Sequence, residues 1–181
     1  MSKFPGDLRI VGEFVNTREM DEGTDEWSTP GQLQAWLVDH GLIARGAAVE
    51  PRDLVRADAV REALRVLALS NNGADVDVGP ATETLNGVAG ITGFHLRFST
   101  EGADLVPAGA GFEEALGRVL AIVAEAMTTG TWDRFKTCAN DECRWVFYDH
   151  ARNHSRRWCS MEVCGNRVKA RSFRERKSQT P

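Results

Sequence analysis

Four cysteines near the C-terminal end constrain the fold of this chain more than any other feature. They are Cys138, Cys143, Cys159 and Cys164, and the residues before Cys138 include no cysteine. The spacing C-x4-C-x15-C-x4-C gives two close pairs separated by a loop, which is typical of a structural tetrahedral zinc site. The pairs have four intervening residues where two are more usual. We expect one structural zinc ion bound by all four thiolates.

Two alternatives concern the ligands of this site. His150 or His154 could replace one cysteine, but both fit better as polar groups on a basic loop. A catalytic zinc ion would keep an open position beside three protein ligands, whereas four thiolates close the site. We therefore expect no catalysis at this metal.

The compartment expected from the sequence agrees with metal binding. The first residues lack a basic segment followed by a long apolar one, so we expect no secretory signal and a cytoplasmic protein. Thiols stay reduced in that compartment, which favours metal binding over disulfides. No apolar run approaches the ~20 residues of a membrane span.

Charge is distributed unevenly along the chain. Residues 1–130 contain 10 Lys and Arg against 20 Asp and Glu, and residues 131–181 contain 12 against 6. The net charges of −10 and +6 recover the total of −4. An acidic part joined to a basic part indicates that the basic part faces a polyanion. The alternative is a solvated basic tail that binds its own acidic body.

Helical patterns dominate residues 1–130. Capping signals and apolar spacings of three and four residues predict helices over 30–40, 51–70, from 79, and over 112–127. Alternation over 94–98 predicts a half-buried strand paired with 104–106. The apolar segment 8–15 could be strand or helix. Four arginines of the second helix lie largely outside its apolar stripe: Arg52, Arg56, Arg61 and Arg65.

We therefore expect a mainly α domain with a small β-hairpin over residues 1–130, followed by a small treble-clef-like α+β zinc finger over residues 131–181. In the finger, residues 145–147 fit a strand of a hairpin, and Ser160 fits the cap of a helix that carries Cys164 in its first turn. A module of about 45 residues is too small for a core of its own, so metal binding should supply much of its folding energy.

The C-terminal stretch resembles the CGNR-type zinc finger over residues 131–177. The match includes the four cysteines, the F-Y-D after the first pair, the run R-N-x-S-R-R-W-C, and Cys164-Gly165-Asn166-Arg167. Ala151 stands where that family most often has Ser or Thr. Three shorter motifs make the preceding part resemble the ABATE domain: F-V-N-T-R, T-P-x-x-L-x-x-W-L and V-R-E-A-L-R. The pair resembles a bacterial family of stress-induced transcription regulators, which implies a helical sensor domain joined to a zinc-dependent nucleic-acid-binding module.

The basic part offers candidate contacts to DNA. Arginine forks suit phosphates, asparagine can pair with adenine, and the final helix is the natural element to enter the major groove. The candidates are Arg152, Asn153, Arg156, Arg157, Asn166, Arg167, Lys169, Arg171 and Arg174. The alternatives are that Asn166 braces the metal loop, that Arg167 bonds thiolates or loop carbonyls, and that Trp145 and Trp158 pack around the metal.

The acidic part offers candidate contacts to a small-molecule effector. Polar side chains at the end of the first apolar segment could line a cleft between helices. The candidates are Asn16, Thr17, Arg18, Trp36, Arg61 and Arg65. The alternative is that Asn16 and Thr17 cap a helix or turn and that Trp36 belongs to the core.

We find no nucleophile elbow, phosphate-binding loop or dinucleotide fingerprint, so we do not expect an enzyme. The sequence favours a zinc-dependent DNA-binding transcription regulator whose N-terminal domain senses a ligand or forms a homodimer. The alternatives are a zinc-stabilised protein-interaction module and a small-molecule-binding protein without DNA affinity.

Overall fold

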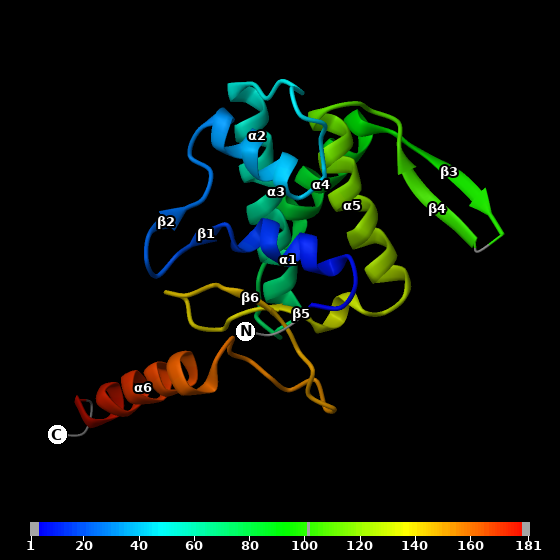
Figure 1. The fold of residues 1–181 in the computed structure, drawn as a ribbon. Coiled ribbons are helices and arrows are strands. Elements are labelled where there is room, and N and C mark those ends of the chain that lie inside the picture. Colours follow the sequence, from blue (N-terminus) through cyan, green and yellow to red (C-terminus); the bar gives the residue numbers. More distant parts are fainter. Residues whose placement is uncertain (1–3, 101, 179–181) are drawn as a thin grey trace.

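The computed structural model describes residues 4–100 and 102–178 (Figure 1). The body contains α1 (Leu8–Asn16), α2 (Pro30–Asp39), α3 (Pro51–Ser70), α4 (Gly79–Thr92) and α5 (Phe112–Thr128). It also contains two antiparallel pairs, β1 (Arg18–Glu19) with β2 (Thr24–Asp25) and β3 (Phe94–Ser99) with β4 (Gly102–Pro107). The finger contains η1 (Trp132–Arg134), the antiparallel pair β5 (Phe135–Thr137) and β6 (Val146–Tyr148), the π-helical turn η2 (Met161–Gly165) and α6 (Asn166–Ser178). The predicted class, a mainly α domain followed by a small α+β finger, is confirmed.

Local capping explains where the helices begin. At α2, the Thr29 hydroxyl accepts a hydrogen bond from the backbone N–H of Gln32 at 3.3 Å. The Gln32 side chain accepts one from the backbone N–H of Ser28 at 2.9 Å. At α3, Glu50 and Asp53 form a capping box ahead of the first turn. These bonds satisfy N–H groups that a helix leaves unpaired, so the predicted starts are confirmed.

The undecided segment 8–15 is helix α1, and it packs between α3 and α5. Phe14 from α1 contacts two tryptophans, with ring centroids 4.9 Å from Trp27 and 5.8 Å from Trp36. The two tryptophans meet edge to face at 5.1 Å. Trp36 is therefore a core residue, as the alternative interpretation expected.

Helix α3 differs from the prediction in where its arginines lie. Arg61 and Arg65 were expected outside the apolar stripe, yet their exposed fractions are 0% and 5%. The β1–β2 ribbon and the finger cover that face of the helix, because Asp25 and the backbone of residue 144 bind the two guanidinium groups. Across the described residues, no helix combines the length and apolar character that spanning a membrane requires.

The β3–β4 hairpin extends away from the helices (Figure 1). Its predicted pairing is confirmed, with Leu96 opposite Leu105. The expectation of a half-buried strand is wrong beyond Phe94, since Leu96, Phe98 and Leu105 are all exposed, Phe98 by 78%. Strand β4 packs against α5 at the base of the hairpin, and the outer part projects beyond the helices, so these side chains do not reach the core.

The finger shares the core of the body. Phe135, Val146 and Tyr148 belong to the same buried cluster as the helices, and the Phe135 ring stacks on Trp132 with centroids 4.8 Å apart. Strand β5 packs against α3, and β6 against α1. The hairpin of the finger therefore gains part of its folding energy by burying apolar surface against the body.

Candidate metal centre and basic surface

The four cysteines bring their sulfur atoms into one cluster. Cys138 follows β5 and Cys143 precedes β6, so the first pair occupies the hairpin loop, and Cys159 and Cys164 meet it from the η2 region. All four Sγ atoms lie within 4.8 Å of one another, and the Cys143–Cys159 and Cys159–Cys164 separations are both 3.6 Å. A tetrahedron with Zn–S bonds of about 2.3 Å has edges of about 3.8 Å. The donor set and spacing therefore fit a zinc ion.

Hydrogen bonds around the sulfurs complete this centre. The Asn140 side-chain amide donates to the Cys164 sulfur at 3.8 Å. Hydrogen bonds from the neighbouring Cys143 and Cys159 thiols lower the pKa of Cys138, and the same contact raises the pKa of Cys143. Such donors orient thiolate ligands and stabilise their negative charge.

Around the cluster, two tryptophans pack against the cysteines, and the histidines lie outside the ligand set. Trp145 and Trp158 pack against the cysteines, which agrees with the packing interpretation. Among the described residues, the clustered ligand atoms belong to cysteines alone, without His150 or His154. His150 instead lies beside the ring of Tyr148, with centroids 5.0 Å apart.

Arg156, one of the candidate DNA contacts, braces the cysteine loop. Its guanidinium donates to the backbone oxygens of Trp158, at 2.9 Å, and of Cys159. It also lies over the Phe147 ring, 4.8 Å from the centroid. These bonds occupy Nε and one terminal nitrogen, so the arginine fork points into the finger.

Arg171 connects α6 to the first cysteine pair. It donates to the side-chain oxygen of Asn140 at 3.0 Å and lies 3.4 Å from a carboxylate oxygen of Glu142. Because Asn140 also donates to a cysteine sulfur, this contact ties the position of α6 to the metal centre.

The Asn166-Arg167 pair of the CGNR signature also makes contacts within the chain. Asn166 donates to the backbone oxygen of Glu162 at 3.0 Å, which agrees with the bracing interpretation. The guanidinium of Arg167 lies 3.6 Å from the carboxylate of Asp21 in the body, and the thiolates are not its partners.

The other candidate contacts are exposed. Their side chains form no ion pair with a residue that the structure describes. On α6, the guanidinium of Arg174 donates to the backbone oxygen of Ala170 at 3.3 Å. The exposed candidates are Arg152, Asn153, Arg157, Lys169 and Arg174.

A buried ion pair that the sequence reasoning missed shapes the basic loop of residues 150–157. Lys136 Nζ lies 2.8 Å from Asp149 Oδ2 and donates to the backbone oxygen of His154 at 2.5 Å. Asp149 accepts hydrogen bonds from the backbone N–H groups of Ala151 and Arg156. Burial raises the pKa of Asp149, but the bonds from Lys136 and these amides outweigh it and hold the pKa below its usual range. The F-Y-D motif was the available signal, because its aspartate directly precedes the loop.

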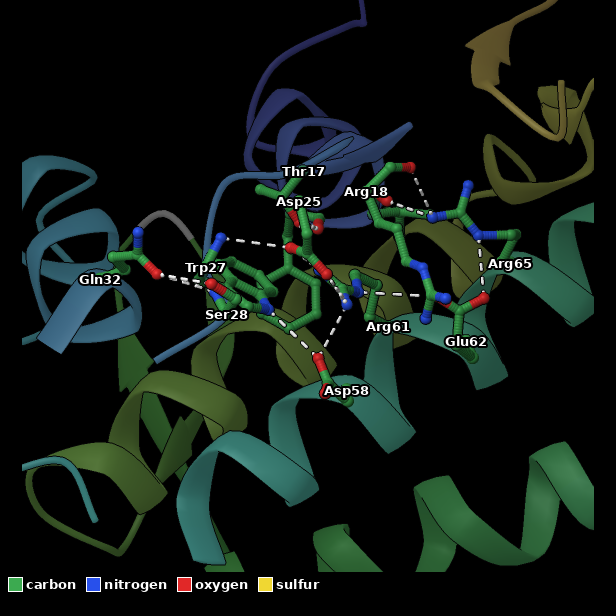
Figure 2. A network of polar contacts seen from close by, with 12 residues as sticks. Thr17, Arg18, Asp25, Trp27, Ser28, Gln32, Asp58, Arg61, Glu62 and Arg65 are labelled. Atoms are coloured by element: carbon green, nitrogen blue, oxygen red, sulfur yellow. Dashed lines mark hydrogen bonds and ion pairs between the residues drawn. The ribbon is translucent and has the colours of Figure 1, made fainter. Parts of the chain in front are cut away.

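In the body, Arg61 is the centre of a polar network (Figure 2). Its terminal nitrogens bind both carboxylate oxygens of Asp25 at 2.8 Å and one oxygen of Asp58 at 2.8 Å. They also donate to the Thr17 hydroxyl at 3.1 Å, and the guanidinium lies over the Trp27 ring at 4.9 Å. The candidate effector contacts Arg61 and Thr17 are thus occupied within the fold.

Asn16 and Arg65, two further effector candidates, join the body to the finger. Asn16 exchanges two hydrogen bonds with the backbone of Val146, at 2.9 and 2.7 Å. Arg65 donates to the backbone oxygens of Arg144 and Val15 at 2.8 and 2.6 Å. Arg18 is the exposed member of the set, on the ribbon beside this network.

A cysteine cluster formed by a hairpin loop and a helix start, attached to a helical body, defines a zinc-finger protein with an N-terminal helical domain. Comparison with known families agrees. The family described as "Putative stress-induced transcription regulator", ABATE, matches residues 8–130, and the CGNR zinc finger matches residues 134–177. The chain belongs to the ABATE family, with a CGNR zinc finger after the ABATE domain. No curated protein matches the chain.

Proposed function

We propose that this protein is a DNA-binding transcription regulator whose finger, residues 131–181, holds one structural zinc ion and contacts DNA. The observation that carries the proposal is a set of exposed cations on the loop 150–157 and on α6 that form no ion pair within the described part of the chain: Arg152, Arg157, Lys169 and Arg174. The body carries a net charge of −10 and would repel phosphates, so we expect the finger to make the phosphate contacts. The family description supports a regulator in a stress response, and a regulator that binds DNA would act in the cytoplasm.

The cations divide into two groups in this proposal. Arg156 and Arg171 hold the finger together, whereas Arg152, Arg157, Lys169 and Arg174 contact phosphates. Helix α6 extends from the body (Figure 1), which leaves its exposed side free to enter the major groove.

The test measures binding of the full chain to random-sequence duplex across a salt series. Each lost phosphate contact should flatten the log–log salt slope by about 0.9. We expect Arg152→Ala/Arg157→Ala/Lys169→Ala to flatten it by about 2 to 3. The matched control Arg45→Ala/Arg52→Ala/Arg118→Ala removes the same charge from exposed positions of the body and should leave the slope unchanged. No binding at 50 mM salt, or equal slopes for both triple variants, would reject the proposal in favour of a protein-interaction module.

We also propose that residues 1–130 form a homodimer. The support is the projecting hairpin, whose exposed Leu96, Phe98 and Leu105 form an apolar surface. Sedimentation equilibrium should give twice the chain mass, and Phe98→Ser should give a monomer. A monomeric wild-type chain would contradict this assignment.

A further inference from the structure

A cleft of about 760 Å³ lies between the body and the finger. We call it the central cleft. One wall comes from α1 and α2, with Glu13 and Trp36, and a second from the acidic segment 19–26. The third wall is the finger, including Trp145 and the sulfur-bearing Cys143 and Cys159. The volume falls in the range of small-molecule sites, which is about 300–1,000 Å³.

The charge of the central cleft is strongly negative. Its lining includes one arginine, Arg9, which is engaged by Glu13 at 2.7 Å. The lining has a formal charge of −4 with His40 neutral. Among the described residues, Glu22 and Glu26 have no ion-pair partner. The carboxylates are Glu13, Glu19, Asp21, Glu22 and Glu26. A zinc ion held by four thiolates would add a net charge of −2 beside them. This environment disfavours an anion and favours a cation.

Aromatic and apolar side chains supply the rest of the surface. Trp36 and Phe147 border the cleft as buried rings, Trp36 with its face stacked against His40 at a centroid distance of 3.7 Å. Trp145, which is partly exposed, faces the cleft from the finger. Val163 of η2 also lines it, with 48% of its surface exposed. Tryptophan faces attract organic cations through the ring quadrupole, and apolar walls take up the hydrocarbon part of a ligand.

We propose that the central cleft binds an amphiphilic organic cation, a quaternary onium or protonated amine carried on an apolar body. Carboxylates alone would suit a metal ion, and apolar walls alone would suit a neutral lipid. Their combination beside the partly exposed ring of Trp145 selects a ligand that has both properties.

Binding here would also act on an ion pair between the body and α6. Asp21 borders the cleft and lies 3.6 Å from the Arg167 guanidinium in the first turn of α6. A cation held by Asp21 and its neighbours competes with Arg167 for the same carboxylate. Its arrival therefore frees the Arg167 guanidinium on α6. The effect of this on DNA rests on the proposed DNA-binding function, whereas ligand binding itself does not.

The test uses the full, zinc-loaded chain and two probes of equal size and opposite charge. Calorimetric titration with tetraphenylphosphonium should show saturable binding that weakens with salt, and tetraphenylborate should bind at least 10-fold more weakly. Glu22→Gln/Glu26→Gln removes two exposed carboxylates of the cleft and should weaken tetraphenylphosphonium binding about 10-fold. The matched control Glu83→Gln/Glu125→Gln removes two carboxylates outside the cleft lining and should leave it unchanged.

Equal affinity for the two probes, no binding of either at millimolar concentration, or equal weakening by both double variants would overturn the assignment. A parallel DNA titration separates the two proposals. If the chain binds tetraphenylphosphonium but not DNA, the ligand-binding proposal stands and the DNA-binding proposal is rejected. DNA binding without tetraphenylphosphonium binding does the reverse.

Discussion

The side-chain amide of Asn16, at the end of α1, exchanges two hydrogen bonds with the backbone of Val146, 130 residues further along the chain. Nδ2 donates to the Val146 oxygen at 2.9 Å, and the Val146 N–H donates to Oδ1 at 2.7 Å. The amide thus acts as a further strand segment beside β6. This pairing joins the body to the hairpin that carries the first two cysteines.

Replacing Asn16 should therefore loosen the contact between body and finger. Asn16→Ala leaves a buried N–H and a buried carbonyl of Val146 unpaired, so we expect a loss of about 2–4 kcal/mol in the free energy of unfolding. Urea unfolding gives the loss, and the Val146 amide should exchange faster with solvent. Asn153→Ala, at an exposed finger position, should change stability by less than about 0.5 kcal/mol. Similar losses for both variants would show that the pairing adds no stability.

The Arg61 network predicts a contrast between two arginines of α3. Arg61→Met keeps the volume but leaves Asp25 and Asp58 without their shared cation, so we expect a loss of about 3 kcal/mol in the free energy of unfolding. Arg56→Met removes an ion pair whose members are about one-third exposed and should cost less than about 1 kcal/mol. Chemical denaturation of both variants measures the difference, and equal costs would contradict a structural role for the buried guanidinium.

The buried Lys136–Asp149 ion pair should contribute strongly to the stability of the fold. Asp149→Asn leaves the buried Lys136 ammonium without its counter-charge, which should cost about 3–5 kcal/mol. Because the folded pKa of Asp149 is lowered, its stabilisation is present above the unfolded pKa of about 3.9 and is lost as pH falls through the folded value.

Unfolding by urea at pH 7 measures the cost of Asp149→Asn. The double variant Lys136→Met/Asp149→Asn should regain part of it, since no uncompensated charge remains. A double variant at least as unstable as Asp149→Asn would show that the lost hydrogen bonds, and not the unpaired charge, set the cost.

Glu19 predicts a pH dependence of the opposite sign. Burial, followed by repulsion from Glu22 and Asp21, raises the pKa of Glu19. Its contribution to stability is present below the unfolded value of 4.5 and is lost as pH rises through the folded pKa. We expect Glu19→Gln to raise Tm at pH 8, with the gain vanishing near pH 4.5. Carbon-detected titration of Glu19 should show a lower pKa in Glu22→Gln, and an unchanged pKa would exclude the repulsion.

Metal removal should affect two parts of the finger differently. Metal analysis should give one zinc ion per chain. After chelation, amide exchange should accelerate over residues 138–144 and 157–168, where the cysteines supply the contacts. Strand β5 should stay protected, because it packs against α3 in the shared core. Cys159→Ser should reproduce the effect of chelation. Loss of protection throughout the finger would show that the metal, and not the core, holds the hairpin.

Much of this fold could be predicted from short segments of the sequence. Cysteine spacing indicated the metal cluster, and the signals at Thr29, Pro51 and Ser160 placed helix starts, because these features depend on residues a few positions apart. A strand at 8–15 could not be excluded from the sequence, since a short apolar run fits both the two-residue period of a strand and the 3.6-residue period of a helix. The segment is helix α1 in the structure, where its buried face packs against α3 and α5.

The sequence by itself determined the order of the parts, the cysteine donor set and the separation of acidic from basic charge. Tertiary structure alone decided how each cation is used. It buried Arg61 between two aspartates, turned Arg156 toward the cysteine loop and left Arg157 exposed. It also placed the acidic segment 19–26 opposite the finger, which created the central cleft. The physical reason is that the partners of a charged side chain decide whether it is buried in an ion pair or free to bind a ligand. Here those partners lie as far as 146 residues away along the chain, as between Arg167 and Asp21.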